Sequence, residues 1–408
     1  EIGEFRAMME EKKLAGEPEA GPLTDSEATA LRGFLDQFQD ITFGGFVDNY
    51  YQWESIDPNA GDNNAINPKV FDKQVHSFTV RNIEMWLYKE AADIGDVGFK
   101  ITLNWGDTAR RITFVGPVAD DASTITGGRQ TTFSEGYVTW KAPIGKGLDI
   151  KFGKFATWVG YEVWESIWNP NSSRSYIYGW GIPFTNQGVG FSYPILDNLT
   201  GDFYFTQSSD TFVNNNRAFT YGTQWDYNPA DISIFKGINV HLDTLWGQEN
   251  ASNDEQWIQR YDVTVSFSPL EKWSFANNFN YGHAAADGAG ANRVLKTTQL
   301  WGNATYIIYQ HNDWLGGAVR GEYFWDQDNM AQIIGGTNTL GGSLFEITGT
   351  MNILLRDHLW IRPEIRYDEI VHVPGGDDSP GLNPEDAWDN NGTHDANLTF
   401  SISSAYEW

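Results

Sequence analysis

Seven histidines and many carboxylates are the residues of this chain whose chemistry could support catalysis. A hydrolase needs a histidine within reach of a nucleophile or of a metal ion. No histidine lies in an HExxH motif, no serine lies in a GxSxG motif, and the chain has no cysteine. His241 has apolar neighbours and lies two positions before Asp243, a pattern typical of a structural histidine. We therefore expect that the chain is not an enzyme.

The charged residues instead alternate regularly with apolar ones. Arg362, Glu364 and Arg366 occupy alternate positions of LWIRPEIRY, and Arg320 and Glu322 do the same in GGAVRGEYFW. Successive side chains of a β-strand point to opposite faces, so each segment has one apolar and one charged face. Charges of both signs would be costly in a packed core, whereas a water-filled interior would solvate them. The pattern favours strands whose apolar face is directed outward.

The composition narrows the class of protein. The chain has 408 residues, of which 40% are apolar, so it is not a disordered tail. Its formal net charge of −27 argues against nucleic acid as a partner, because phosphates need Lys and Arg. No apolar run approaches the roughly 18–20 residues of a spanning helix, so any membrane crossing must use strands. The chain starts at Glu1 without a basic and apolar leader, and we expect a signal peptide to have been removed.

About sixteen segments from residue 41 onward have the pattern of strands, and we expect only loops between them. Each is near the roughly 9–11 residues that a tilted membrane strand needs. Long and short connections alternate, as in outer-membrane barrels with short periplasmic turns and longer outer loops. The segments are ITFGGFVDNYY, SFTVRNIEMWLY, VGFKITLNW, FSEGYVTWKA, LDIKFGKF, QGVGFSYP, LTGDFYFTQ, AFTYGTQWDY, INVHLDTLW, RYDVTVSF, WSFANNFNY, TQLWGNATYII, GGAVRGEYFW, SLFEITGTMNI, LWIRPEIRY and LTFSISSAYEW.

The last segment alternates apolar and small polar residues and ends on Trp408. A final amphipathic strand with an aromatic end resembles the signal read by the barrel-assembly machinery, which we expect as a partner. The sequence therefore predicts an all-β fold, a transmembrane antiparallel β-barrel of about 16 strands over residues 40–408. We expect it in the outer membrane of a bacterium, in contact with lipid and with both termini periplasmic.

Residues 1–39 differ in pattern from the barrel. Thr24 and Glu27 fit a capping box, and an apolar stripe with helical spacing begins at Leu31. The pattern predicts a short N-terminal helical segment. It either plugs the lumen or caps the periplasmic mouth of the barrel, and its narrow apolar stripe slightly favours the cap.

The stretch 137–193 resembles the Putative beta-barrel porin-2 family. The matching pieces are Tyr137 with Lys141, FGKF at 152–155, VGYEV at 159–163, NPN with SRS at 169–175, and GIPFTNQG at 181–188. Trp158 departs from the family pattern, where a proline is expected. The resemblance implies an outer-membrane channel of a Gram-negative-like bacterium, without enzyme activity, assembled as a homotrimer.

The connection 160–185 is rich in Trp, Tyr and Gly. The third long loop of sixteen-stranded general porins folds into the lumen, and we expect the same here, with packing on the rim or on a neighbouring subunit as the alternative. Opposed charges on loop and wall would set a transverse field. Simple pairing of the wall arginines with Glu322 and Glu364 is the alternative. The candidate pore-lining residues are Glu162, Glu165, Arg174, Arg320, Glu322, Arg362, Glu364 and Arg366.

The last long connection is acidic and offers oxygen ligands that could suit Ca²⁺. Its spacing matches no Ca²⁺ loop, a solvated acidic surface is the simpler interpretation, and we expect no other cofactor. The weak Ca²⁺ candidates are Asp377, Asp378, Asp386 and Asp389. The predicted function is passive diffusion of small hydrophilic solutes and ions through a water-filled channel. A closed structural or partner-binding barrel is the alternative, and an outer-membrane hydrolase is less favoured.

Overall fold

The structure is a computed structural model. The expected N-terminal helical segment, residues 1–39, lies outside the residues that it describes. No helix among the described residues is long and apolar enough to cross a membrane. The described residues are 40–56, 68–112, 131–207, 209–210, 214, 216–229, 237–249, 257–285, 297–326, 328, 330, 342–356, 358–372 and 396–408.

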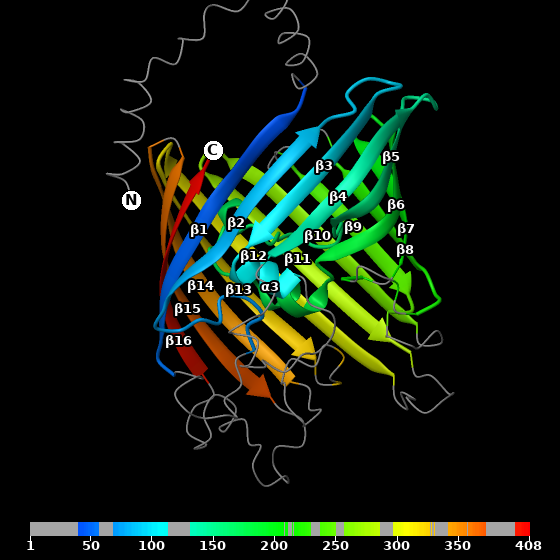
Figure 1. Cartoon of the computed structure of the whole chain (residues 1–408). Coiled ribbons are helices and arrows are strands. Elements are labelled where there is room, and N and C mark those ends of the chain that lie inside the picture. The colour runs from blue at the N-terminus through cyan, green and yellow to red at the C-terminus, as the bar shows by residue number, and fades with distance from the viewer. Residues whose placement is uncertain are drawn as a thin grey trace, which may run out of the picture. The chain divides into compact units, whose positions relative to one another are not determined.

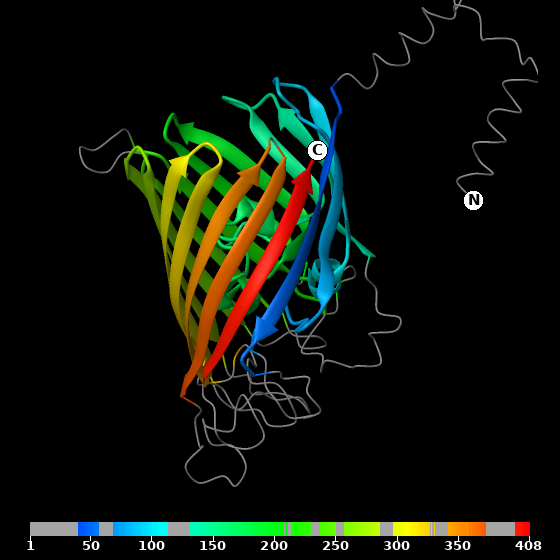
Figure 2. The ribbon, with the colours of Figure 1, turned by 90° about the vertical axis from the view of Figure 1, so that its left-hand side faces the viewer.

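Sixteen strands form one closed barrel, in which β16 returns to pair with β1 (Figure 1, Figure 2). At this seam the strands are antiparallel, with Phe46 opposite Glu407 and Glu54 opposite Thr399. A closed barrel leaves no unpaired strand edge, so its backbone can lie within an apolar layer. The prediction of an antiparallel barrel of about 16 strands is confirmed. The strands are β1 (Thr42–Glu54), β2 (Phe78–Lys89), β3 (Val97–Trp105), β4 (Thr131–Ala142), β5 (Leu148–Ala156), β6 (Thr185–Leu196), β7 (Leu199–Thr206), β8 (Thr220–Tyr227), β9 (Asn239–Gly247), β10 (Ile258–Leu270), β11 (Trp273–Ala284), β12 (Thr298–Asn312), β13 (Leu315–Asp326), β14 (Gly342–Leu355), β15 (Leu359–His372) and β16 (Ala396–Glu407).

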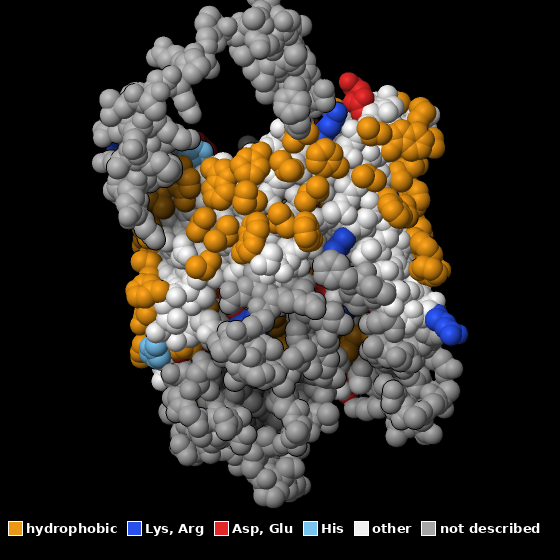
Figure 3. Space-filling view, in the orientation of Figure 1, with side chains coloured by type: hydrophobic (Ala, Val, Ile, Leu, Met, Phe, Trp, Pro, Cys, Tyr) orange, Lys and Arg blue, Asp and Glu red, His pale blue; other side chains and the backbone are white. Residues whose placement is uncertain are grey.

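The strands turn an apolar face outward and a polar face inward, as the alternation predicts. On β3, Val97 and Ile101 are 63% and 39% exposed, whereas Thr102 and Asn104 are fully buried. Apolar side chains accordingly form a broad band over the outside of the strands (Figure 3). An outward apolar band of this kind is the surface that lipid covers in membrane barrels.

One described helix contradicts the expectation of only strands and loops after residue 41. Helix α3 (Asp107–Ile112) follows β3 directly. Gly106 has a φ of +109°, which lets the chain leave the strand, and Arg110 donates to Asp107 at 2.7 Å across the single turn. Six residues are too few to show the apolar period of a helix, so the sequence pattern does not reveal it.

The interior of the barrel contains an apolar cluster as well as polar side chains. Leu300 and Phe324 project into it from the wall, and both are fully buried. Ile177 and Tyr178 come from the connection between β5 and β6 and are at most 2% exposed. The chain therefore fills part of its own lumen with packed side chains. This differs from the prediction of a uniformly water-filled interior.

Candidate functional site

Residues 157–184, which connect β5 to β6, fold into the barrel and are called the inward segment here (Figure 1, Figure 2). The segment contains a 3-10 turn (Ser166–Trp168) and a π-helical turn (Ile177–Gly181). Trp158 donates its indole N–H to the carbonyl of Thr244 on β9 at 3.1 Å. The indole N–H of Trp164 reaches Glu84 on β2, also at 3.1 Å. The segment therefore crosses the lumen from one part of the wall to another, and the predicted inward folding is confirmed.

Arg320 on β13 binds both the wall and the segment. Its guanidinium lies 2.8 Å from a carboxylate oxygen of Glu162 and 2.5 Å from one of Glu346. The same group donates to the carbonyl of Ser173 at 2.8 Å. Charge-assisted hydrogen bonds are stronger than neutral ones, so this arginine is a main attachment point of the segment.

Two arginines of β15 hold carbonyl groups of the segment. Arg362 donates to the carbonyl oxygens of Asn169 at 2.8 Å and Pro170 at 2.9 Å. Arg366 donates to the carbonyl oxygen of Arg174 at 2.7 Å, and its guanidinium lies over the Tyr176 ring. Buried carbonyl groups without a partner are costly, so these contacts let an irregular backbone exist inside the barrel.

Wall carboxylates complement the arginines by accepting backbone N–H groups of the segment. Glu364 accepts from Ser172 at 2.7 Å and from Ser173 at 3.1 Å. Glu322 accepts from the residue pair 176–177 at 2.6 and 2.7 Å. The wall thus satisfies donors and acceptors of the same stretch, which fixes its path on both sides of the backbone.

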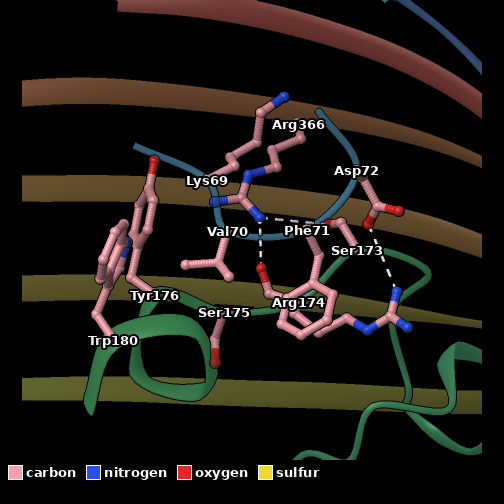
Figure 4. A pocket seen from close by; sticks show the side chains of 10 residues that line it. All are labelled: Lys69, Val70, Phe71, Asp72, Ser173, Arg174, Ser175, Tyr176, Trp180 and Arg366. Carbon is pink, nitrogen blue, oxygen red and sulfur yellow. Dashed lines mark hydrogen bonds and ion pairs between the residues drawn. The ribbon is translucent and has the colours of Figure 1, made fainter. Parts of the chain in front are cut away.

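A second piece of chain, residues 68–73, packs against the inward segment. Asp72 pairs with Arg81 of β2 at 2.7 Å. It also pairs with Arg174 at 3.5 Å (Figure 4). Burial raises the pKa of the Asp72 carboxyl, but the two arginines outweigh burial and hold that pKa below its ordinary value. A cavity lined by Asp72, Arg174 and Arg366, among others, encloses about 10 Å³, the space of about one water molecule.

The structure buries all eight predicted pore-lining residues inside the barrel, where the Arg174 side chain binds Asp72 and carbonyl groups of its own segment. They are at most 7% exposed: Glu162, Glu165, Arg174, Arg320, Glu322, Arg362, Glu364 and Arg366. The expected opposition of Arg320 and Glu162 is a direct ion pair, not two charges across open water. Among the described residues, Glu322 and Glu364 form no ion pair with a wall arginine within 4 Å and accept backbone N–H groups of the segment. Solute selection by the eight residues stays a prediction.

The sequence reasoning missed three residues of this site, which are Arg81, Asn82 and Asp72. Arg81 and Asn82 are adjacent, yet both are buried and point inward, because the alternation of β2 shifts between them. The signal in the sequence is the break in the alternation of apolar and polar residues at VRNI. Asp72 carries no local signal, since only the fold brings it to Arg81.

The Ca²⁺ candidates Asp377, Asp378, Asp386 and Asp389 lie outside the described residues. Within the described part of the chain, no group of three His, Asp or Glu side chains is placed to hold a metal ion.

Solved structures with the same fold are outer-membrane proteins. The anion-selective porin from Comamonas acidovorans is 8% identical, covering 90% of this chain and 99% of its own, with a TM-score of 0.56. OmpT of Vibrio cholerae in its trimer form is 9% identical, with coverages of 90% and 99% and a TM-score of 0.53. OmpF of Salmonella typhi in complex with daunomycin is 10% identical, with coverages of 90% and 97% and a TM-score of 0.55. At these identities the likeness shows the fold.

The family assignment comes from sequence. No curated protein matches the chain. A family profile matches residues 40–407, which is the whole barrel from the start of β1 to the end of β16. This is the family whose motifs the stretch 137–193 carries. The chain belongs to the family described as Putative beta-barrel porin-2, OmpL-like, and it is an outer-membrane porin channel.

Proposed function

We propose that this porin passes small hydrophilic solutes by passive diffusion along the part of the lumen that the inward segment leaves open. The observation that carries this proposal is a contrast in exposure. The eight charges between segment and wall are at most 7% exposed. By contrast, the inward-facing side chains of Lys100, Lys141 and Asp149 on β3–β5 are 27%, 24% and 42% exposed.

The two groups of charges then have different tasks. The buried group holds the inward segment at one position and so sets the size limit of the channel. The exposed group meets solutes directly, because water and ions can reach these side chains. The exposed set extends to β8, where the Asp226 side chain is 35% exposed. It carries both signs and so orients polar solutes as they pass.

The apolar cluster supports a second candidate, a closed barrel with a structural or partner-binding task. Segment 157–184, residue Phe71 and helix α3 all contribute to a packed interior. Single-channel recording in a planar bilayer, with a salt gradient across it, separates the candidates. Discrete conductance steps with a defined reversal potential support the open channel. A correctly folded barrel that stays silent refutes it and leaves the closed barrel.

We also propose that the barrel assembles as a homotrimer, inserts through the barrel-assembly machinery and has both termini in the periplasm. The trimer form of OmpT supports the first point. The amphipathic strand β16, with Phe400 and Tyr406 exposed on its outer face, supports the second. Native mass spectrometry in detergent tests assembly, since a monomer mass under mild conditions would contradict the trimer. Protease protection of a C-terminal tag in intact cells tests the orientation.

A further inference from the structure

The outer surface of the barrel is hollowed where β16 meets β1, the red and blue strands in Figure 2. A groove of about 450 Å³ lies over these strands and reaches β15 and β2 on either side. Phe78 and Ile402 in its lining are 89% and 49% exposed, so the groove is open on the outside of the barrel. We call it the seam groove, and it is lined by the apolar and aromatic side chains of Tyr51, Phe78, Ile361 and Ile402 and by the polar side chains of Asn49 and Ser404.

The two polar residues of the seam groove lack partners. Asn49 of β1 lies directly opposite Ser404 of β16 in the strand register. The residues next to them, Tyr50 and Ser403, are 2% and 3% exposed and face the lumen. By strand alternation, Asn49 and Ser404 therefore face outward. Among the described residues, neither the Asn49 amide nor the Ser404 hydroxyl makes a hydrogen bond.

The position of this pair along the strands places it deep in the membrane. On the outer face of β16, Ser404 is four residues from Phe400 and four from Trp408, which are 45% and 41% exposed. A strand advances about 3.3 Å per residue, so each aromatic residue lies roughly 13 Å along the strand from Ser404. Exposed aromatic rings near strand ends mark the two membrane interfaces. Ser404 and Asn49 therefore lie near the middle of the apolar layer, where a polar group without a partner is costly.

Another outward amide shows how the barrel satisfies such a group. Asn277 of β11 also lies four residues from an aromatic residue on each side. Its amide exchanges two hydrogen bonds with the amide of Asn303 on β12, at 3.1 and 3.2 Å. It also donates to the Thr305 hydroxyl at 2.9 Å. These groups satisfy one another within one barrel, whereas the contacts of Asn49 must come from outside it.

We propose that the seam groove is the surface by which this chain contacts further copies of itself. The inference rests on the proposed homotrimer and assigns its interface. Lipid tails bring no hydrogen-bond partner to the middle of the membrane, whereas a second copy brings an amide and a hydroxyl that each donate and accept. In a closed trimer the same surfaces meet around the threefold axis, so Asn49 of one copy reaches an oxygen of the next. The apolar walls of the groove pack against the neighbouring barrel.

The first test removes the amide or fills the hollow, and measures assembly of the full chain by native mass spectrometry in mild detergent. Asn49→Leu and Ser404→Trp should each raise the concentration at which the trimer dissociates about tenfold, the effect of one strong hydrogen bond between membrane segments. Asn277→Leu is the matched control, because it makes the same replacement at the same depth, and it should leave this concentration unchanged. Circular dichroism verifies that each variant is folded. Unchanged assembly of Asn49→Leu and Ser404→Trp overturns the proposal.

A second measurement locates the interface in the intact trimer. The chain has no cysteine, so a single introduced cysteine carries one spin label per copy. Phe400→Cys places the label on β16 beside the groove, and Phe279→Cys places it on β11, where the outward side chains are 45% and 39% exposed. Pulsed EPR should give a shorter distance between copies for Phe400→Cys than for Phe279→Cys. The reverse order overturns the seam interface and keeps the trimer.

The outcomes separate this inference from the proposed function. A barrel that is monomeric under mild conditions and still conducts refutes the homotrimer and this interface, and keeps the channel. A monomer that retains a phospholipid, which Ser404→Trp releases, assigns the seam groove to lipid instead. A trimer that conducts no ions, with the shorter distance for Phe400→Cys, supports the interface and refutes the open channel.

Discussion

Arg320 of β13 and Glu162 of the inward segment form an ion pair of 2.8 Å in which the two side chains are 0% and 1% exposed. Arg320 also pairs with Glu346 of the neighbouring strand. One guanidinium thus bridges a carboxylate of the loop and a carboxylate of the wall. This relation explains why a loop that crosses the lumen has one fixed position.

Replacement of this arginine should release the segment. Arg320→Met keeps the bulk of the side chain but leaves Glu162 buried without its cation and Glu346 with Arg366 alone, at 4.0 Å, a change that costs about 3–5 kcal/mol. We expect a lower unfolding temperature in detergent and a larger, noisier single-channel conductance. Lys146→Met is the control, because its pair with Asp197 is exposed and should contribute little. An unchanged conductance in a destabilised Arg320→Met barrel would show that the segment does not limit the channel.

The other end of the segment depends on the absence of a side chain. Trp158 stacks on Tyr204 at 4.0 Å, and a Cβ atom at Gly222 would come within 2.0 Å of its indole. Gly222→Ala should displace the indole and cost about 1–3 kcal/mol. Gly321→Ala is the matched control, because a Cβ atom there meets open space. Equal unfolding temperatures for the two variants would contradict this packing.

The sequence predicts the barrel well because strand alternation is a local property. The charged face of GGAVRGEYFW requires only that residues two apart share a side, and the structure confirms it for Arg320 and Glu322. The helical turn at 107–112 is not predicted from the sequence, because it is too short to show the apolar period of a helix. The inward path of segment 157–184 follows from its composition together with the family resemblance.

The partners inside the lumen cannot be predicted in this way. Arg320 meets Glu162 across 158 positions of sequence, and the neighbouring Glu322 on the same strand binds backbone N–H groups instead. The choice depends on how the segment lies against the wall, which no local pattern records. In the sequence, Trp168 is likewise one aromatic residue among several. Only the fold shows that its side chain is exposed.

Glu165 should make stability depend on pH. Burial, and then the nearby Glu84 carboxylate, raise the pKa of Glu165 well above its ordinary value. Its folded-state pKa therefore exceeds its unfolded-state pKa of about 4.3, and the folded protein loses stability as the pH rises above that value. Glu165→Gln should be more stable than the wild type at pH 8, and the difference should vanish near pH 4. A constant difference across this range would contradict a buried, protonated Glu165.

Asp72 should show the opposite dependence. Arg81 and Arg174 hold its pKa below the ordinary value despite burial, so the folded-state pKa lies below the unfolded-state value of about 3.9. The stabilisation is complete at pH values above that and is lost as the pH falls through the folded-state pKa. Asp72→Asn should therefore unfold at a lower temperature than the wild type at pH 7. The unfolding temperatures of the two proteins should converge in strong acid.

The difference in unfolding temperature between the wild type and Asp72→Asn isolates the effect of Asp72 from that of the many other carboxylates that titrate in acid. Asp197→Asn is the control, because that carboxylate lies on an exposed turn and should leave the unfolding temperature nearly unchanged at either pH. If the gap between wild type and Asp72→Asn widens in acid, the pairing of Asp72 with Arg81 and Arg174 does not stabilise the folded barrel. If it closes, the contact between residues 68–73 and the inward segment is held by charge.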